Sequence, residues 1–255
     1  MKNCIFTCLL LMATSTANAT LINIDFGPST SPTYDGQGIL GTGADTTWNS
    51  VNVGTPNNVE STNLDYADGT GASGVAVTVD GAWDFNGNNT DPGGTAVGTN
   101  PLLGDRIANV TPNEPATITL TGLTAGQLYD IVLYAGFYAQ DYSISGQSIT
   151  ATINPVYPGG ASSSYPDWQS GEEYVVLASV VADSSGEVGI LVDPLSCTLP
   201  TSGIFCGSLD SGSDTNGYAE IAGMQIQAVP LPAAMYLFGT GLLGLAGIAK
   251  RKKTA

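Results

Sequence analysis

The stretch that decides the fold is Ile118-Thr-Leu-Thr-Gly-Leu-Thr-Ala-Gly-Gln-Leu-Tyr-Asp-Ile-Val-Leu-Tyr134. Apolar side chains alternate with threonine in its first part, which is typical of a β-strand with one buried face. Its last part is apolar on both faces, as in a strand that is covered on both sides. The glycines between them are turn residues, so the stretch predicts two strands joined by a tight corner.

Similar signals recur throughout residues 20–228. Alternation predicts half-buried strands at Ile22–Phe26, Val75–Val79, Ile118–Leu120, Val188–Val192 and Met224–Ala228. In the last of these strands, Gln225 and Gln227 are expected to face outward. Leu128–Ala135 and Tyr174–Val181 are apolar on both faces and suit central strands.

Helical signals are almost absent from this region. Only the segment from Leu102 to Val110 suits a helical turn or two, because Asn100 offers a cap and Pro101 a first helical position. About nine strand-like runs with glycine-rich turns predict an all-β fold. We expect an antiparallel β-sandwich, and within that class a jelly roll.

Both ends of the chain have the features of targeting segments. Residues 1–19 are expected to be a secretory signal peptide, with Lys2 in the positive region, Ile5–Ala13 as the apolar region and Ala17-Asn18-Ala19 as the cleavage site. The exported domain would then cover residues 20–228, and residues 229–255 would form a separate tail.

The tail has three parts. Val229, Pro230, Leu231 and Pro232 are followed by an uncharged run to Ala249 and then by Lys250, Arg251, Lys252 and Lys253. A helix from Ala233 to Ala249 would be about 25 Å long, enough for one transmembrane helix at the lower limit of length. The basic end would stay on the cytoplasmic side and leave the domain outside. An ordinary membrane anchor and a processing signal both fit these properties.

The segment from Val229 to Lys253 resembles the PEP-CTERM sorting signal in its Val-Pro-Leu-Pro variant. The resemblance implies that an exosortase, a membrane cysteine transpeptidase, recognises the tail and cuts near the proline motif. It also implies a bacterium that makes exopolysaccharide, transient anchoring in the inner membrane, and a destination at the cell surface or in the extracellular matrix. Leu231 stands where other members of the family have glutamate, which leaves the cleavage position open.

The body of the chain resembles known modules in only a few short segments. The stretch from Ile118 to Tyr134 resembles the strand, Gly-Leu corner and Tyr-strand pattern of galactose-binding-like and fibronectin-like modules. Asn23-Ile-Asp-Phe-Gly27, Tyr34-Asp-Gly-Gln-Gly38, Thr47-Trp-Asn49 and the strand from Tyr218 to Gln227 resemble other PEP-CTERM cargo domains. The resemblance implies an exported β-domain, but such a scaffold supports many functions.

Charge excludes one class of partner. Outside the two targeting segments the chain has 22 acidic residues and one cation, Arg106, for a net charge of −21. A body of this charge does not bind nucleic acid and attracts divalent cations instead.

Residue types also limit catalysis. The chain has no histidine, which excludes a Ser-His-Asp triad and histidine-ligated metals. Cys197 and Cys206 lie close together in a chain that is expected to be exported, so we predict a disulfide bond between them. We therefore expect no enzyme. Glycoside cleavage needs only two carboxylates and is the alternative that the acidic residues leave open.

One polar loop is a candidate calcium site. Asp84, Asn86, Asn88 and Asp91 offer oxygen ligands in the loop that follows Trp83. The spacing is not that of an EF-hand, and a loop of Asx turns explains the same residues. No other cofactor is expected.

Four aromatic residues lie in polar, loop-like contexts. Trp48, Trp83, Tyr165 and Trp168 would suit exposed platforms for sugar rings, with Trp168 the first choice. For each tryptophan, packing at an end of the sandwich is the favoured interpretation.

These observations lead to one expected function and two alternatives. We expect a non-enzymatic exported protein of the cell envelope or extracellular matrix, sorted by its tail and associated with exopolysaccharide. The alternatives are a carbohydrate-binding module, with or without calcium, and an enzyme that cleaves polysaccharide with carboxylates.

Overall fold

The computed structural model describes the greater part of the region between residues 20 and 230. The described residues are 20–27, 33–52, 59–61, 63–80, 83–85, 101–104, 106–109, 111–134, 139–154, 168–195 and 217–230. Thr20–Val229 forms a compact unit of its own, and a second unit contains Met1–Ala19 and Pro230–Ala255. The predicted signal peptide, transmembrane helix and basic tail lie outside the described residues. Within the described ranges, no helix has the length and apolar character to cross a membrane.

The regular secondary structure of the described residues is β-strand except for one short helix, which confirms the predicted all-β class. Its elements are β1 (Leu21–Gly27), β2 (Trp48–Asn52), β3 (Val59–Ser61), β4 (Ala76–Asp80), β5 (Trp83–Phe85), α1 (Pro101–Gly104), β6 (Ile107–Asn109), β7 (Ala116–Thr121), β8 (Leu128–Tyr134), β9 (Gln140–Ile144), β10 (Thr150–Ile153), β11 (Tyr174–Val181), β12 (Val188–Pro194), β13 (Glu220–Ile221) and β14 (Gly223–Ala228).

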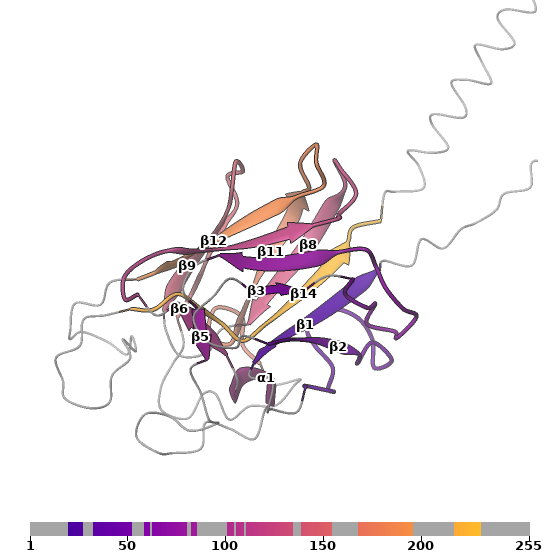
Figure 1. Ribbon diagram of the computed structural model, residues 1–255, viewed down its shortest axis with the longest axis horizontal. Helices are drawn as coiled ribbons and strands as arrows, with labels where there is room; N and C mark the ends of the chain where they lie inside the picture. The colour runs from indigo at the N-terminus through magenta and orange to yellow at the C-terminus, as the bar shows by residue number, and fades with distance from the viewer. Residues whose placement is uncertain are drawn as a thin grey trace, which may run out of the picture. The chain divides into compact units, whose positions relative to one another are not determined.

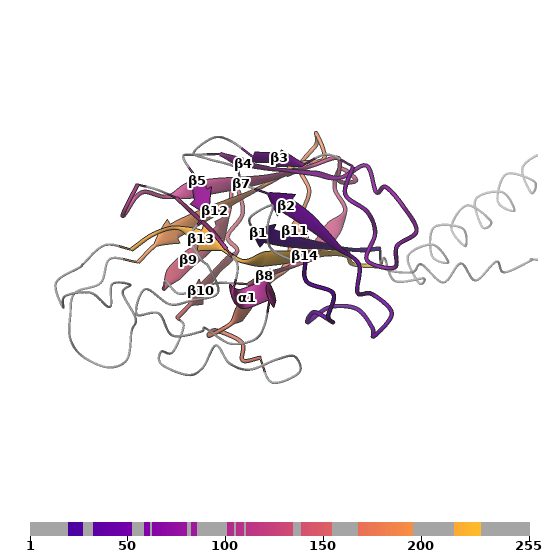
Figure 2. The same ribbon diagram turned by 60° about the horizontal axis from the view of Figure 1, so that its bottom comes forward.

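The strands form two large sheets and one small sheet (Figure 1). The five-stranded sheet has the order β11-β8-β14-β1-β2, the six-stranded sheet β10-β9-β12-β7-β4-β3, and the small sheet β13-β6-β5. In Figure 2, β3, β4 and β7 lie in a layer above β1, β14 and β8. Apolar side chains from both large sheets pack in one core, so the arrangement is sandwich-like. The pairing is antiparallel except between β1 and β2, which run parallel.

The stretch that predicted the fold connects the two large sheets. Its first half is β7, with alternate residues buried, and its second half is β8, which lies between β11 and β14. The corner between them has Gly122 and Gly126 at φ values of 78° and 73°, a region that favours glycine. The hydroxyl oxygen of Tyr129 accepts a hydrogen bond of 2.9 Å from the Thr124 N–H and closes the corner. The predicted pair of strands and its tight corner are confirmed.

The two corner glycines allow a matched test of this geometry. A Cβ on Gly122 would lie 2.2 Å from the Gly74 carbonyl oxygen, whereas a Cβ on Gly126 would meet nothing within 4 Å. We expect Gly126→Ala to cost about 1 kcal/mol from the left-handed backbone alone, and Gly122→Ala about 2 to 3 kcal/mol because the strands must also separate. Urea unfolding measures both free-energy losses, and equal losses would show that the close approach of Gly74 to Gly122 does not constrain the corner.

One strand that was predicted to be central lies at an edge. β11 pairs with β8 and is the outermost strand of its sheet, and Val176 and Val181 are exposed on it. Apolar residues on both faces could not reveal how many neighbours the strand has, so the prediction was wrong. A bulge between Leu177 and Val180 places Ser179 at a φ of 59°, and bulges of this kind oppose pairing with another chain.

The edge strand is also held by a side-chain amide. Gln147, in the turn between β9 and β10, donates from Nε2 to the Val181 carbonyl (2.8 Å) and accepts from the Val181 N–H at Oε1 (3.0 Å). The amide therefore takes the place of a neighbouring strand at this residue and ties the edge of one sheet to a turn of the other.

The predicted half-burial of β1 and β14 was also wrong. Asn23, Asp25 and Gln225 were expected to face solvent, but all three are buried, as are Ile24 and Met224 on the opposite face. The outer face of the five-stranded sheet is covered by a second apolar cluster that includes Tyr34, Ile39 and Leu40 from the segment of residues 33–47. The period of two correctly separates the two faces, but it does not show that both are covered.

The helical prediction was correct only at its start. α1 begins at Pro101, as the cap signal indicated, but it ends at Gly104. Ile107–Asn109 is β6, paired with β5 and β13. Short helical and β-signals look alike over so few residues, and pairing with distant strands decides between them.

Candidate functional site

The outer face of the five-stranded sheet carries a buried aromatic cluster. Tyr34, Trp48, Tyr134 and Trp168 pack together with Leu102, Leu103, Val132 and Ala222. The ring centroids of Tyr34 and Trp48 are 5.1 Å apart, as are those of Tyr134 and Trp168, and both pairs meet edge to face. This geometry is the favourable one for aromatic pairs. The segments that contain Tyr34, Leu102 and Trp168 are thereby held against side chains of the sheet itself.

A buried amide fixes the covering segment beside these rings. Gln225 Oε1 accepts from the Leu40 N–H (2.8 Å) and from the Tyr134 hydroxyl (2.6 Å). Its Nε2 donates to Asn23 Oδ1 (2.8 Å) and to the Leu40 carbonyl (3.1 Å). All the hydrogen-bonding capacity of this amide is therefore used within the protein.

Two further polar residues of β1 complete the attachment. Asn23 Nδ2 donates to the carbonyls of Asp45 and Thr47 at 3.0 and 3.2 Å. Asp25 Oδ2 accepts from the Tyr34 N–H at 2.8 Å. The polar side chains of β1 thus form hydrogen bonds with the backbone of the covering segment and not with solvent.

This packing bears on the predicted carbohydrate platforms. Trp48 and Trp168 are only 7% and 5% exposed, so neither presents an open ring face on which a sugar could stack. The Trp48 Nε1–H also donates to the Gly36 carbonyl, at 2.8 Å. Packing was thus rightly favoured over exposed platforms for these two residues, but they pack on the outer face of the five-stranded sheet and not at an end of the sandwich. Tyr165 and the side chain of Trp83 lie outside the described residues.

The predicted calcium loop and disulfide also lie outside the described part. The backbone of Asp84 belongs to β5, whereas Asn86, Asn88 and Asp91 are not among the described residues, nor are Cys197 and Cys206. In the ranges that the structure describes, no three acidic, cysteine or histidine side chains gather as metal ligands would. Calcium binding at the loop stays a prediction.

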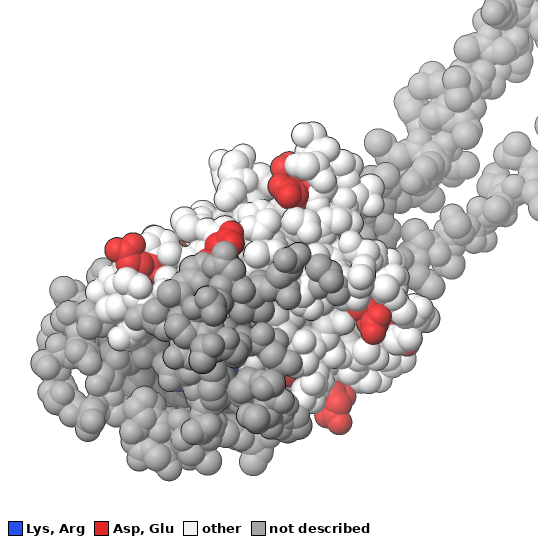
Figure 3. Space-filling view, viewed as in Figure 1, with Lys and Arg blue, Asp and Glu red and all other residues white. Residues whose placement is uncertain are grey.

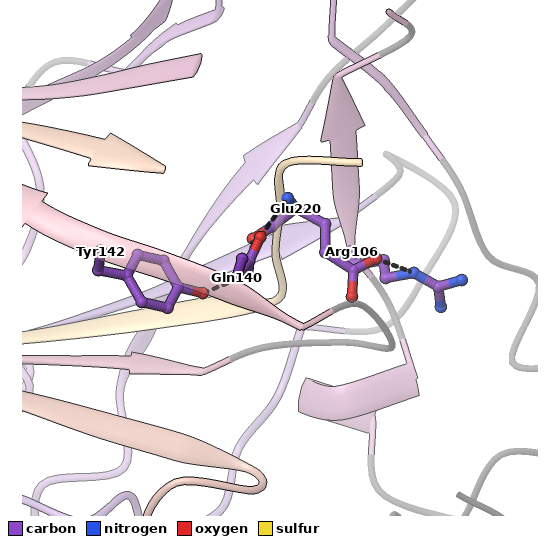
Figure 4. Close-up of polar contacts among 4 residues, drawn as sticks. All are labelled: Arg106, Gln140, Tyr142 and Glu220. Atoms are coloured by element: carbon purple, nitrogen blue, oxygen red, sulfur yellow. Dashed lines mark hydrogen bonds and ion pairs between the residues drawn. The ribbon is translucent and has the colours of Figure 1, made fainter. Parts of the chain in front are cut away.

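The cation of the body forms a buried ion pair. Arg106 Nε lies 2.8 Å from Glu220 Oε2, and both side chains are almost inaccessible to solvent, at 3% and 0% (Figure 4). Arg106 precedes β6 and Glu220 begins β13, so the pair joins two neighbouring strands of the small sheet. Two charges removed from water depend on each other for compensation.

A glutamine links this pair to the main core. Gln140 Oε1 accepts from the Glu220 N–H (2.9 Å), and its Nε2 donates to the Glu220 carbonyl (2.7 Å). The same Nε2 also contacts the Tyr142 hydroxyl, as Figure 4 shows. Burial raises the pKa of Tyr142, and the nearby Glu220 carboxylate raises it further. The phenol therefore stays protonated at alkaline pH values that ionise an exposed tyrosine.

The three buried carboxylates in the described part have structural partners. Asp25 accepts from Tyr34, Glu220 pairs with Arg106, and Glu173 Oε2 accepts from the Gln169 N–H at 2.8 Å. The first two contacts attach a loop or a strand end to the sheets, and the third lies within the turn before β11. Burial of these acids is thus accompanied by specific partners within the fold.

The exposed acids are spread over the surface. They are Asp35, Asp65, Asp68, Asp80, Glu114, Asp183, Glu187 and Asp193. Figure 3 shows acidic patches separated by uncharged surface in that view. Asp183 lies in a turn and accepts hydrogen bonds from the Glu187 N–H and the Ser185 hydroxyl. These bonds lower the pKa of Asp183, and the bond from Glu187 has the larger effect. Since Arg106 is buried, the exposed charges of the described residues are all negative.

The end of the compact unit coincides with the start of the proline motif. Val229 is its last residue, and the Val229 N–H donates to the Leu128 carbonyl at 2.9 Å. Gln127 Nε2 donates to the Val229 carbonyl at 2.7 Å. Pro230, the first proline of the motif, is exposed.

Comparison of the whole chain with known proteins finds no family model and no curated protein that matches it.

Proposed function

We propose that this chain is a non-enzymatic exported protein that an exosortase sorts and processes at its C-terminal tail. The tail would hold the protein at the inner membrane at first, and processing would then deliver the body to the cell surface or the extracellular matrix. There the body would be associated with exopolysaccharide. In this proposal the tail determines the destination, and the body is the cargo.

The observation that carries the proposal is the coincidence of two boundaries. The proline motif, apolar run and basic cluster occupy Val229 to Lys253, and the compact unit ends at Val229. A sorting enzyme needs an accessible segment next to a folded cargo, and an exposed Pro230 directly after the compact unit suits this need. A surface whose described charges are all negative also suits an exported protein, because it keeps the molecules apart and soluble.

The order of the strands supports the finer assignment of a jelly roll. The chain passes from β7 in the six-stranded sheet to β8 in the five-stranded sheet and back to β9. It crosses again between β11 and β12. Repeated crossing between two facing sheets is what a jelly roll requires.

The proposal can be tested by following the tail in cells. The full chain is expressed in an exopolysaccharide-producing bacterium and in the same strain without its exosortase. The mass of the body and its membrane or extracellular location are then measured. We expect loss of the tail and release from the membrane only where the exosortase is present.

Matched variants identify the signal. The double variant Pro230→Ala/Pro232→Ala should remain unprocessed and membrane-bound, whereas Pro115→Ala, at an exposed proline outside the tail, should be processed like the original protein. A chain that keeps its tail in both strains would be an anchored membrane protein, and this result would refute the proposal.

A further inference from the structure

The last strand of the body is fastened at its final residue. Both backbone polar groups of Val229 are engaged: its N–H donates to the Leu128 carbonyl and its carbonyl accepts from Gln127 Nε2. The same Nε2 donates to the Leu128 carbonyl at 3.0 Å. One amide thus joins the end of β14 to the beginning of β8.

Gln127 is itself held in place by the corner between β7 and β8. Its N–H donates to the Thr124 carbonyl (3.0 Å), and its carbonyl accepts from the Ala182 N–H (3.1 Å). The Gly126 N–H donates to the Ala182 carbonyl, at 2.9 Å. The amide therefore approaches Val229 from a backbone that is fixed on both sides, and it needs little ordering to bind.

In the described part of the chain, the pairing of β14 reaches no further than Val229. Pro230 has no N–H to donate, so it cannot extend β14 along β8. On the other side of β14, the Ala228 N–H donates to the Thr20 carbonyl (3.3 Å), and Leu21 lies opposite Gln227. Figure 1 shows β1 beside β14. Residues up to Val229 are thus engaged in the sheet, and Pro230 offers no N–H with which to continue the pairing.

We propose that Gln127 sets the inner limit of tail processing, because it keeps Val229 in the folded body. A processing enzyme binds its substrate as an extended segment whose backbone groups are free, and cleavage of a paired segment must wait for local opening. The bonds on either side of Val229 do not meet this requirement while the body is folded, because both backbone polar groups of Val229 are engaged. Gln127 is therefore a positioning residue for the tail. This inference rests on the proposed function.

The position at which the folded body begins to resist cleavage can be measured without the sorting enzyme. The full chain in detergent micelles is digested with proteinase K, and the masses of the resistant body are followed with time. We expect the body to end at Val229 or Pro230. In Gln127→Ala, cleavage at the bonds on either side of Val229 should be about fivefold faster, as loss of one neutral hydrogen bond predicts.

Two further variants make the result specific. Gln127→Glu turns a carboxylate toward the carbonyls of Leu128 and Val229 and should speed the same cleavage more than the alanine variant does. Thr152→Ala removes the exposed hydrogen bond between Thr152 and Asp141, which joins β10 to β9 in the other large sheet, and should leave cleavage at Val229 unchanged. A resistant body that ends before Ala228, or a Gln127→Ala variant that is cut no faster, would overturn the inference.

The same variants in cells separate this inference from the proposed function. With exosortase present, the processed body should end at or beyond Pro230 in the original chain and include shorter products in Gln127→Ala. A tail that stays uncut in every strain, together with the expected proteinase K pattern, would overturn the proposed function and uphold the boundary.

Discussion

Replacement of Arg106 by methionine is expected to destabilise the body by about 3 to 5 kcal/mol. Glu220 is fully buried, and the variant leaves its carboxylate without the cation that lies 2.8 Å away. Methionine fills a volume similar to that of the arginine stem, so the loss comes mainly from the uncompensated charge and less from packing. Urea unfolding with an unchanged m-value measures the loss as a lower midpoint.

The double variant Arg106→Met/Glu220→Leu is the control for this result. It removes both charges. Gln140 keeps its two hydrogen bonds to residue 220, because they go to the main-chain carbonyl and N–H of that residue. The double variant should therefore recover most of the stability that the single variant loses. If the two variants are equally unstable, the loss comes from packing, and the ion pair is not what matters at this site.

Replacement of Gln225 by leucine is expected to cost about 3 to 4 kcal/mol. It leaves the Leu40 N–H, the Leu40 carbonyl and Asn23 Oδ1 each short of one hydrogen bond in a buried layer. An unsatisfied buried group typically costs about 1 to 3 kcal/mol, and some of these groups can rearrange. Near-ultraviolet circular dichroism and urea unfolding should show a disturbed aromatic cluster and a lower midpoint.

Gln227→Leu is the matched control, since Gln227 lies two residues further along β14 on the same face and is only partly buried. It should change the free energy of unfolding by no more than about 0.5 kcal/mol. Equal losses in the two variants would mean that the amide of Gln225 does not hold the covering segment on the sheet.

The sequence was sufficient for those features that depend on neighbours along the chain. The alternation around Ile118 and the glycines of the corner predicted β7, β8 and their connection, because strand periodicity and turn chemistry are local. The start of α1 at Pro101 was predicted for the same reason. β11 was assigned wrongly, because the number of strands beside it depends on residues far away in the sequence.

The polar layer shows a second limit of sequence reasoning. Asn23 and Gln225 alternate with apolar residues as surface positions do, and only the covering segment of residues 33–47 makes them buried. A weak signal was present, because amides at successive outward positions of two strands can bond a backbone as well as water. Likewise, the role of Gln127 at Val229 follows only from the pairing of β14 with β8.

The side-chain amides have a consequence for the conditions that this fold can withstand. Gln127, Gln140, Gln147 and Gln225 attach distant backbone segments with neutral groups, and the one cation among the described residues is sealed from solvent. Dissolved ions weaken exposed charge pairs by screening them, but they have little effect on neutral hydrogen bonds or on buried charges. The amide hydrogen bonds and the buried ion pair should therefore contribute the same stability at low and at high salt concentration. Salt should act mainly on the repulsion among the exposed acidic side chains.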